Sequence, residues 1–278
     1  MRIRISRLAQ AVLASAALGV LVGSCGEDGS SDSSRPAASE RERAGGSSVR
    51  VVALGDSETS GQGDPTGLGW VGRYARLLRT EAGLRVDVSN LARDGKTSAE
   101  LLADLRSDAD TRAAVKGSQI VLFGIGGADL NAGDDNFAAG NCKGERCYAP
   151  GLTSFSRNFD AIVGAVRELR GSHKTVLRSV TQPNVLTGAE DVIPPFLKPI
   201  ATRIGTYQAR TANQAICRGM AKYDGQCIDV LRAFNGSNGT ANAYKQGLLN
   251  HEQCCYPSAK GQQLMAQLLF STGLAPIR

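Results

Sequence analysis

The sequence predicts an α/β protein, a three-layer α/β/α sandwich around a mainly parallel sheet of about five strands. Strand-like and helix-like segments alternate from residue 49 to residue 273, which is typical of crossover connections in a parallel sheet. The segment 118–127, SQIVLFGIGG, is continuously apolar, as expected of a strand buried on both faces. The 278 residues are enough for one sizeable domain.

The elements follow from their hydrophobic periodicity. Segment 49–54, VRVVAL, predicts the first strand, and 68–83 predicts a helix because its apolar residues recur at helical spacing. The further expected strands are 84–92, 118–127, 173–183 and 226–234. The further expected helices are 98–117, 152–171, 197–225 and 258–273. Segment 142–151, with two cysteines, is expected to be a loop.

The N-terminus predicts export. A charged MRIRISR precedes a short apolar run, too short for a confident membrane span, so residues 1–24 are interpreted as a signal peptide. The run closes as LVGSC, which resembles a bacterial lipobox and implies lipidation of Cys25. An ordinary signal peptide with an incidental cysteine is the alternative. Residues 25–48, lipidated Cys25 included, are rich in Gly, Ser and charge and predict a flexible tether; the folded domain is expected over 49–278.

Six cysteines follow Cys25. An even number in an exported chain predicts three disulfides, which can pair in about 15 ways. The short loops Cys142–Cys147 and Cys217–Cys227 are the simplest pairings. They leave a vicinal Cys254–Cys255 bridge, which is rare, so a crossed pairing stays open. No CxxC motif occurs, and neither a metal site nor a cofactor is expected.

The charge pattern disfavours a nucleic-acid partner. The net charge is +6 and the pI about 9.0, but Lys and Arg are scattered rather than gathered in a stripe. We expect a monomer whose partners are small molecules, with membrane contact only through the lipid anchor.

The stretch ALGDSETSG contains the first candidate for catalysis. Ser57 lies at the carboxyl end of the first predicted strand, and ligands of parallel α/β sheets bind beyond the carboxyl ends of the strands. A serine in this place can also serve only to cap the following helix. The strand-end position therefore makes Ser57 a candidate nucleophile, with a structural alternative.

This stretch, together with SNLARDGKTS at 89–98, resembles the SGNH (GDSL) hydrolase family. The resemblance extends over most of 49–273. It implies a flavodoxin-like sandwich that cleaves esters with a Ser-His-Asp triad, and it implies Ser57 as nucleophile. The backbone N–H groups of Ser57 and Gly95 would form the oxyanion hole, because fixed amide donors stabilise the negative oxygen of a tetrahedral intermediate.

Two blocks depart from the family pattern. In FGIGGADLN, Gly126 and Asp129 fit, but Ala128 stands where the family has the asparagine donor. Losing one such donor costs about 2.7–4 kcal/mol where it has been tested. Asn131 also carries an amide, but three residues further along the chain.

The second departure concerns the base. Before the last helix the family has Asp-x-x-His-Pro, and here the two slots hold Gln253 and Tyr256. His251 lies five residues upstream of the histidine slot and is the candidate base. Tyr256 is the possible base if His251 is not, although a tyrosine of pKa near 10 is a weak base at neutral pH. Asp229 is a further candidate to support the base.

Together these residues predict an exported, lipid-anchored esterase or lipase of the cell envelope, acting on a small ester, a lipid or an acylated glycan. The alternative is a catalytically impaired protein of the same fold that binds an acyl or glycan ligand. The two readings differ in whether His251 reaches Ser57.

Overall fold

The computed structural model describes residues 47–277 except 194, 196 and 254. The predictions of a signal peptide, a lipidated Cys25 and a tether up to residue 46 therefore lie outside the described residues. The described chain forms a five-stranded sheet in the order β2-β1-β3-β4-β5, and every neighbouring pair is parallel. The strands are β1 (Ser48–Gly55), β2 (Arg85–Asn90), β3 (Ile120–Gly124), β4 (Val176–Val180) and β5 (Gln226–Ile228).

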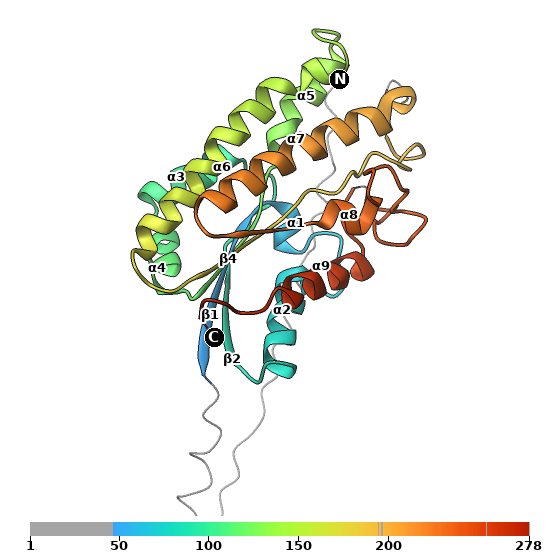
Figure 1. Ribbon diagram of the computed structural model, residues 1–278. Coiled ribbons are helices and arrows are strands. Elements are labelled where there is room, and N and C mark those ends of the chain that lie inside the picture. The colour runs from blue at the N-terminus through green and yellow to red at the C-terminus, as the bar shows by residue number, and fades with distance from the viewer. Residues whose placement is uncertain (1–46, 194, 196, 254, 278) are drawn as a thin grey trace, which may run out of the picture. The chain divides into compact units, whose positions relative to one another are not determined.

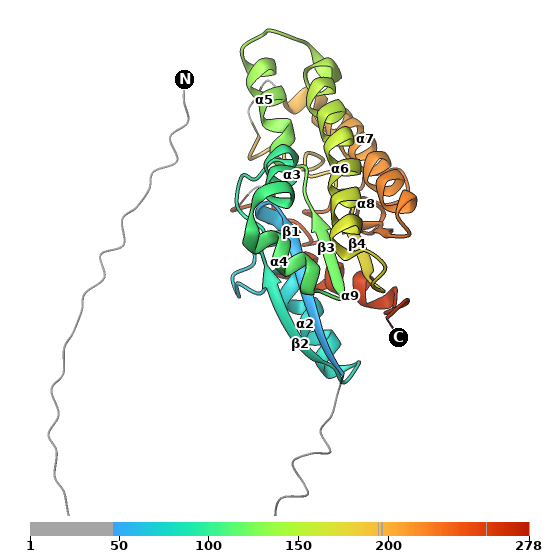
Figure 2. The ribbon, with the colours of Figure 1, turned by 90° about the vertical axis from the view of Figure 1, so that its left-hand side faces the viewer.

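Helices cover both faces of this sheet, as expected for parallel strands (Figure 1). On one face, α2 (Gly69–Thr80) packs against α9 (Ala259–Ser271). The other face carries a connected group of helices, visible from the side in Figure 2: α3 (Ser98–Ser107), α4 (Ala109–Gly117), α6 (Ala149–Arg170) and α7 (Ala201–Lys222). The predicted sandwich is confirmed.

The core explains why the sheet has this order. All five residues of β3 are buried, and so are all five of β4, because each strand has a neighbour on both sides and helices above and below. The edge strand β2 instead alternates between exposed and half-buried residues over most of its length. The continuous apolar run and the alternating run of the sequence thus correspond to a central strand and an edge strand.

Four features differ from the sequence-based prediction. The single helix expected over 98–117 is two helices, α3 and α4, because Asp108 is extended and its carboxylate caps α4 by accepting from the N–H of Thr111 at 2.7 Å. Asp229 likewise caps α8 (Val230–Asn235), so the strand expected over 226–234 ends at Ile228. A short helix α5 (Asn131–Ala138) was not predicted, and the expected loop 142–151 contains a 3₁₀ turn over Gly144–Cys147 and the start of α6.

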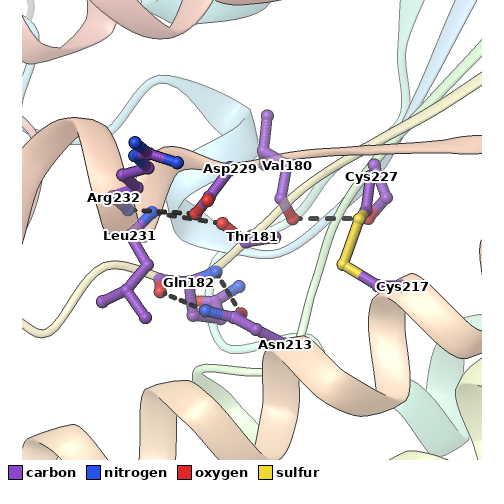
Figure 3. The surroundings of a disulfide bond; sticks show 10 residues. Val180, Thr181, Gln182, Asn213, Cys217, Cys227, Asp229, Leu231 and Arg232 are labelled. Atoms are coloured by element: carbon purple, nitrogen blue, oxygen red, sulfur yellow. Dashed lines mark hydrogen bonds between the residues drawn. A yellow bond between two sulfur atoms is a disulfide. The ribbon is translucent and has the colours of Figure 1, made fainter. Parts of the chain in front are cut away.

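Two disulfides join the predicted short loops, Cys142–Cys147 and Cys217–Cys227. Cys255 is also disulfide-bonded, but its partner lies outside the described residues. Figure 3 shows how Cys217 on α7 is tied to Cys227 on β5. Disulfides persist in oxidising compartments, so they indicate an extracellular protein.

The Cys217–Cys227 bridge predicts a measurable contribution to stability. It closes a loop of 10 residues, and a loop of this size contributes roughly 2–3 kcal/mol by constraining the unfolded chain. Replacing both cysteines by serine should lower the free energy of unfolding by about that amount in urea titrations. A double variant at Cys142 and Cys147, whose loop of 5 residues is shorter, should lose less. Equal losses from the two variants would contradict this explanation.

Among the described residues, no helix is both long and apolar enough to cross a bilayer.

Candidate active site

Ser57 is the first residue of α1 (Ser57–Ser60), directly beyond the carboxyl end of β1. The turn between them is tight, because a Cβ on Gly55 would lie 2.1 Å from the carbonyl oxygen of Gly124 on β3. The hydroxyl of Thr59 donates to that same carbonyl at 2.7 Å. The turn therefore requires glycine at position 55, and it fixes Ser57 between the ends of β1 and β3.

Asp56 joins the ends of these two strands. Its carboxylate accepts hydrogen bonds from the backbone N–H groups of Gly126 and Gly127, at 3.0 and 3.1 Å, and from that of Glu58 at 3.3 Å. Burial raises the pKa of Asp56 to about 6, against the lowering effect of these backbone donors. Asp56 thus caps α1 and holds the loop after β3 next to Ser57.

Gly95 lies in the loop after β2. Its φ of 71° is left-handed, which favours glycine. The loop is anchored to the nucleophile turn, because the N–H of Arg93 donates to the carbonyl oxygen of Gly55 at 3.1 Å. Within the described residues, the backbone N–H groups of Ser57 and Gly95 donate no hydrogen bond. Both remain available to an incoming oxygen.

The loop after β3 lacks the side-chain donor that the family pattern has at position 128. Ala128 offers no side-chain donor, whereas Asp129 accepts from the backbone N–H and the hydroxyl of Ser98, at 3.0 and 2.5 Å. The amide of Asn158 donates to the same hydroxyl at 2.9 Å. Asp129 therefore holds the start of α3, and its pKa is raised mainly by burial.

These loops surround one cavity of about 330 Å³. Ser57, Gly95 and Tyr256, three of the residues singled out from the sequence, line it together, and so do Ala128 and Asn131. The remaining lining residues come from the same strand ends, from α5 and α7, from the loop after β4 and from the loop before α9: Asp56, Glu58, Asp94, Gly126, Gly127, Leu130, Asp134, Gln182, Pro183, Val185, Leu186, Gly205, Gln208, Ala209, Ala212 and Cys255.

His251 does not line this cavity. It is exposed, and its ring lies against that of Tyr244 with the ring centroids 4.6 Å apart. The loop that carries it is closed at its base, where Leu249 pairs with Pro257 and the N–H of Asn250 donates to the carbonyl of Tyr256 at 3.0 Å. This closure keeps Tyr256 at the cavity and His251 in the outer part of the loop.

The sequence-based search missed two residues of this site. Gln182, just after β4, lines the cavity and is held by Asn213 of α7 (Figure 3): its backbone N–H donates to the Asn213 side chain at 2.7 Å, and its carbonyl accepts from it at 2.9 Å. Asp229, a candidate to support the base, instead caps α8 by accepting from the N–H of Arg232 at 3.0 Å.

Glu58 is the second residue that was missed. It also lines the cavity, with only 8% of its surface exposed. Its Oε1 atom is buried and has no hydrogen-bond partner among the described residues. Burial, and then the neighbouring carboxylate of Asp56, raises the pKa of Glu58 to about 8. Its position directly after the candidate nucleophile was the one available sequence signal.

The described residues contain no group of three or more His, Cys, Asp or Glu side chains that could hold a metal ion. The cavity is therefore characterised by its serine, its backbone donors and its carboxyl groups.

A serine at a strand end, unused backbone donors beside it and a parallel sheet between helix layers are the features that the sequence led us to expect of an ester hydrolase. Residues 53–264 match the model of the GDSL-like Lipase/Acylhydrolase family, and the chain belongs to this family. Membership classes it with the carboxylic ester hydrolases.

A curated protein is also similar to part of the chain. The uncharacterized protein YpmR of Bacillus subtilis is 31% identical over 144 residues, which are 51% of this chain and 55% of YpmR. The chain thus matches about half the length of that curated relative.

Solved structures share the fold. The lipase Lip_vut3 from a goat rumen metagenome superposes with a TM-score of 0.68 at 19% identity, covering 83% of this chain and 100% of the lipase. An extracellular lipase of Streptomyces rimosus gives a TM-score of 0.58 at 18% identity, covering 80% and 99%. Axe2 of Geobacillus, an acetyl-xylooligosaccharide esterase, gives a TM-score of 0.54 at 20% identity, covering 81% of this chain and 94% of Axe2. At these identities the likeness shows the fold alone.

Proposed function

We propose that the protein is an exported, lipid-anchored serine esterase that cleaves small carboxylic esters with Ser57 as nucleophile. One observation carries the proposal: Ser57 and Gly95 line one cavity, and the backbone N–H groups of both are unused within the described residues. The cavity volume of about 330 Å³ is at the small end for ligand pockets. A short ester therefore fits the proposal better than a long lipid chain.

The proposed reaction begins with attack of the Ser57 hydroxyl oxygen on the ester carbonyl. The carbonyl oxygen becomes an oxyanion that accepts hydrogen bonds from the N–H groups of Ser57 and Gly95. The C–O bond to the alcohol then breaks, and the alcohol leaves with a proton. Water attacks the acyl-serine in the second half of the reaction and releases the acid and free Ser57. Asp56 keeps the loops in position through its backbone hydrogen bonds.

The hydroxyl of Ser57 must give its proton to an acceptor, and we propose that a residue of the loop 249–257 is this acceptor. His251 is the acceptor predicted from the sequence, but it lies outside the cavity in the described arrangement and would require the loop to move. Tyr256 already lines the cavity. A reaction that relies on Tyr256 should be slow at neutral pH, since an ordinary phenol ionises near pH 10.

Two variants distinguish these acceptors. His251→Ala should leave most of the hydrolysis rate of p-nitrophenyl acetate, because the histidine ring lies against Tyr244, outside the cavity. Tyr256→Phe should lower the rate about 10²-fold, the usual contribution of a positioned acid or base. The pH–rate profile of the wild type should rise towards alkaline pH. A large loss in His251→Ala, with a profile rising through pH 6–7, would instead establish His251 as the base.

A binding protein without turnover is the second candidate. It is favoured by the observation that no histidine lines the cavity. In that case the cavity would hold an acyl or glycan ligand, and the wild type would bind a short ester without hydrolysing it. Release of p-nitrophenol above the rate of the Ser57→Ala variant is the experiment that separates the two candidates.

The anchoring part of the proposal has its own test. Changing Cys25 to Ala should move the protein from the membrane fraction to the soluble fraction and abolish labelling by a palmitate analogue. The physical reason is that an attached acyl chain contributes about 0.8 kcal/mol of membrane affinity for each buried CH₂. A wild-type protein that already fractionates as soluble and takes up no label would show that the Cys25 prediction is wrong.

A further inference from the structure

The cavity that contains Ser57 is acidic, although the whole chain carries a net charge of +6. Four carboxyl groups line it, and none of its lining residues in the described part of the chain is Lys, Arg or His. The four are Asp56, Glu58, Asp94 and Asp134. A concave site lined by one sign of charge focuses its field on whatever enters.

These carboxyl groups are not neutralised by nearby cations. The charged neighbours that raise the pKa values of Asp56, Glu58 and Asp134 are themselves carboxyl groups, after the larger effect of burial. Asp94 forms no ion pair within the described residues.

The two cations of the loop after β2 do not line the cavity. Arg93 and Lys96 flank Asp94 and Gly95, yet both bind the same carboxylate oxygen of Asp104, at 2.9 and 2.5 Å. On α7 the lining residues are uncharged, and Arg203 of the same helix pairs with Glu145 at 3.0 Å. The charges that line the cavity at neutral pH are therefore mainly those of Asp56, Asp94 and Asp134, because burial raises the pKa of Glu58 to about 8 and keeps its carboxyl largely protonated.

One of the four groups also lacks a partner. The Oε1 atom of Glu58 is buried without a hydrogen bond among the described residues, while Asp56 accepts three from the backbone and Asp134 accepts one from the hydroxyl of Tyr148 at 2.7 Å. A buried carboxylate oxygen left unpaired is costly, and the raised pKa of Glu58 reflects this cost, because the protonated form is favoured near neutral pH.

We infer that the cavity selects esters that carry a positive charge close to the scissile bond, such as esters of amino alcohols, and disfavours anionic esters. The inference rests on the proposed function, since it concerns the substrate of the same cavity. Neutral esters would gain nothing from the field, and a carboxylate or phosphate on the substrate would be repelled by Asp94 and Asp134.

The test compares isosteres that differ only in charge. Acetylcholine and its carbon analogue, 3,3-dimethylbutyl acetate, should be titrated by calorimetry into the full-length Ser57→Ala protein, where neither can be turned over. At low salt acetylcholine should bind about tenfold more tightly, the effect of one unit-charge pair about 7 Å apart between the dielectric constants of a protein surface and of water. This ratio should fall towards one in 0.5 M salt.

Two further variants locate the effect. Asp94→Asn and Asp134→Asn, combined in the Ser57→Ala protein, should lower the ratio of the acetylcholine affinity to the 3,3-dimethylbutyl acetate affinity several-fold. Asp87→Asn on the exposed edge strand β2 should leave this ratio unchanged. Melting temperatures near that of the parent protein confirm that each variant is folded. A ratio within twofold of one at low salt, or no detectable binding of acetylcholine, contradicts the inference, and so does an unchanged ratio in the double aspartate variant.

Turnover of p-nitrophenyl acetate by the wild type is measured in parallel. Its absence would contradict the proposed esterase and leave the binding ratio to decide the charge inference. Turnover without a charge preference in binding would contradict the charge inference alone.

Discussion

Replacing Ser57 by alanine is expected to lower kcat/KM for p-nitrophenyl acetate by about 10³-fold or to the uncatalysed rate. The side-chain oxygen is the proposed nucleophile, so no acyl-enzyme can form without it. The fold should tolerate the change, because Asp56 caps α1 and the Ser57 hydroxyl donates no hydrogen bond within the described residues. The measurement is p-nitrophenol release, with circular dichroism as a check of folding.

Ser107→Ala is the matched control. Ser107 is an exposed serine at the end of α3 whose hydroxyl binds only its own helix, at the carbonyl of Ala103. The Ser107→Ala variant should hydrolyse p-nitrophenyl acetate at the rate of the wild type. A Ser57→Ala protein that retains more than a tenth of the rate would show that the observed hydrolysis does not use this serine.

Replacing Glu58 by glutamine is expected to stabilise the protein, by a margin that grows between pH 5 and pH 8. The pKa of Glu58 rises to about 8 in the folded protein, mainly through burial, from an unfolded value near 4.3. The folded state thus binds more protons than the unfolded state in this interval, and the free energy of unfolding must fall as the pH rises. For a shift of this size the fall is on the order of 2–4 kcal/mol.

Glutamine does not titrate, so the variant should lose this part of the pH dependence. Urea titrations at pH 5, 6, 7 and 8 provide the measurement, and Glu81→Gln, an exposed residue at the end of α2, provides the control. Since Asp56 titrates in both proteins, only the difference between the curves is interpreted. Parallel stability curves for the wild type and Glu58→Gln would contradict a raised pKa at Glu58.

The parallel sheet of about five strands and the position of Ser57 followed from patterns that are local in the sequence, whereas the strand order was not predicted. The apolar run up to Leu54 predicted a buried strand, and in a parallel sheet its carboxyl end meets the ends of its neighbours. This is why Ser57 and Gly95, 38 positions apart in the sequence, line one cavity. The break between α3 and α4 at Asp108 was missed because the helical periodicity of the sequence continues through this capping residue. The end of β5 before Asp229 was missed because apolar residues continue after it in the sequence.

The base could not be placed from the sequence. Which part of the loop 249–257 enters the cavity depends on the pairing of Leu249 with Pro257, and this contact has no sequence pattern of its own. Glu58 was missed for a related reason. An acidic residue in the first turn of a helix is ordinary, and only the surrounding packing shows that this carboxyl is buried and unpaired.

The nucleophilic role of Ser57 is the central claim, and covalent labelling tests it most directly. The protein should be treated with a fluorophosphonate, digested without reduction of its disulfides, and analysed by mass spectrometry. The account predicts one phosphonyl group on the peptide containing Ser57, with no label in Ser57→Ala and an unchanged label in Ser107→Ala. Equal labelling of Ser57→Ala and wild type, or no label on Ser57 after prolonged exposure at alkaline pH, would contradict the claim.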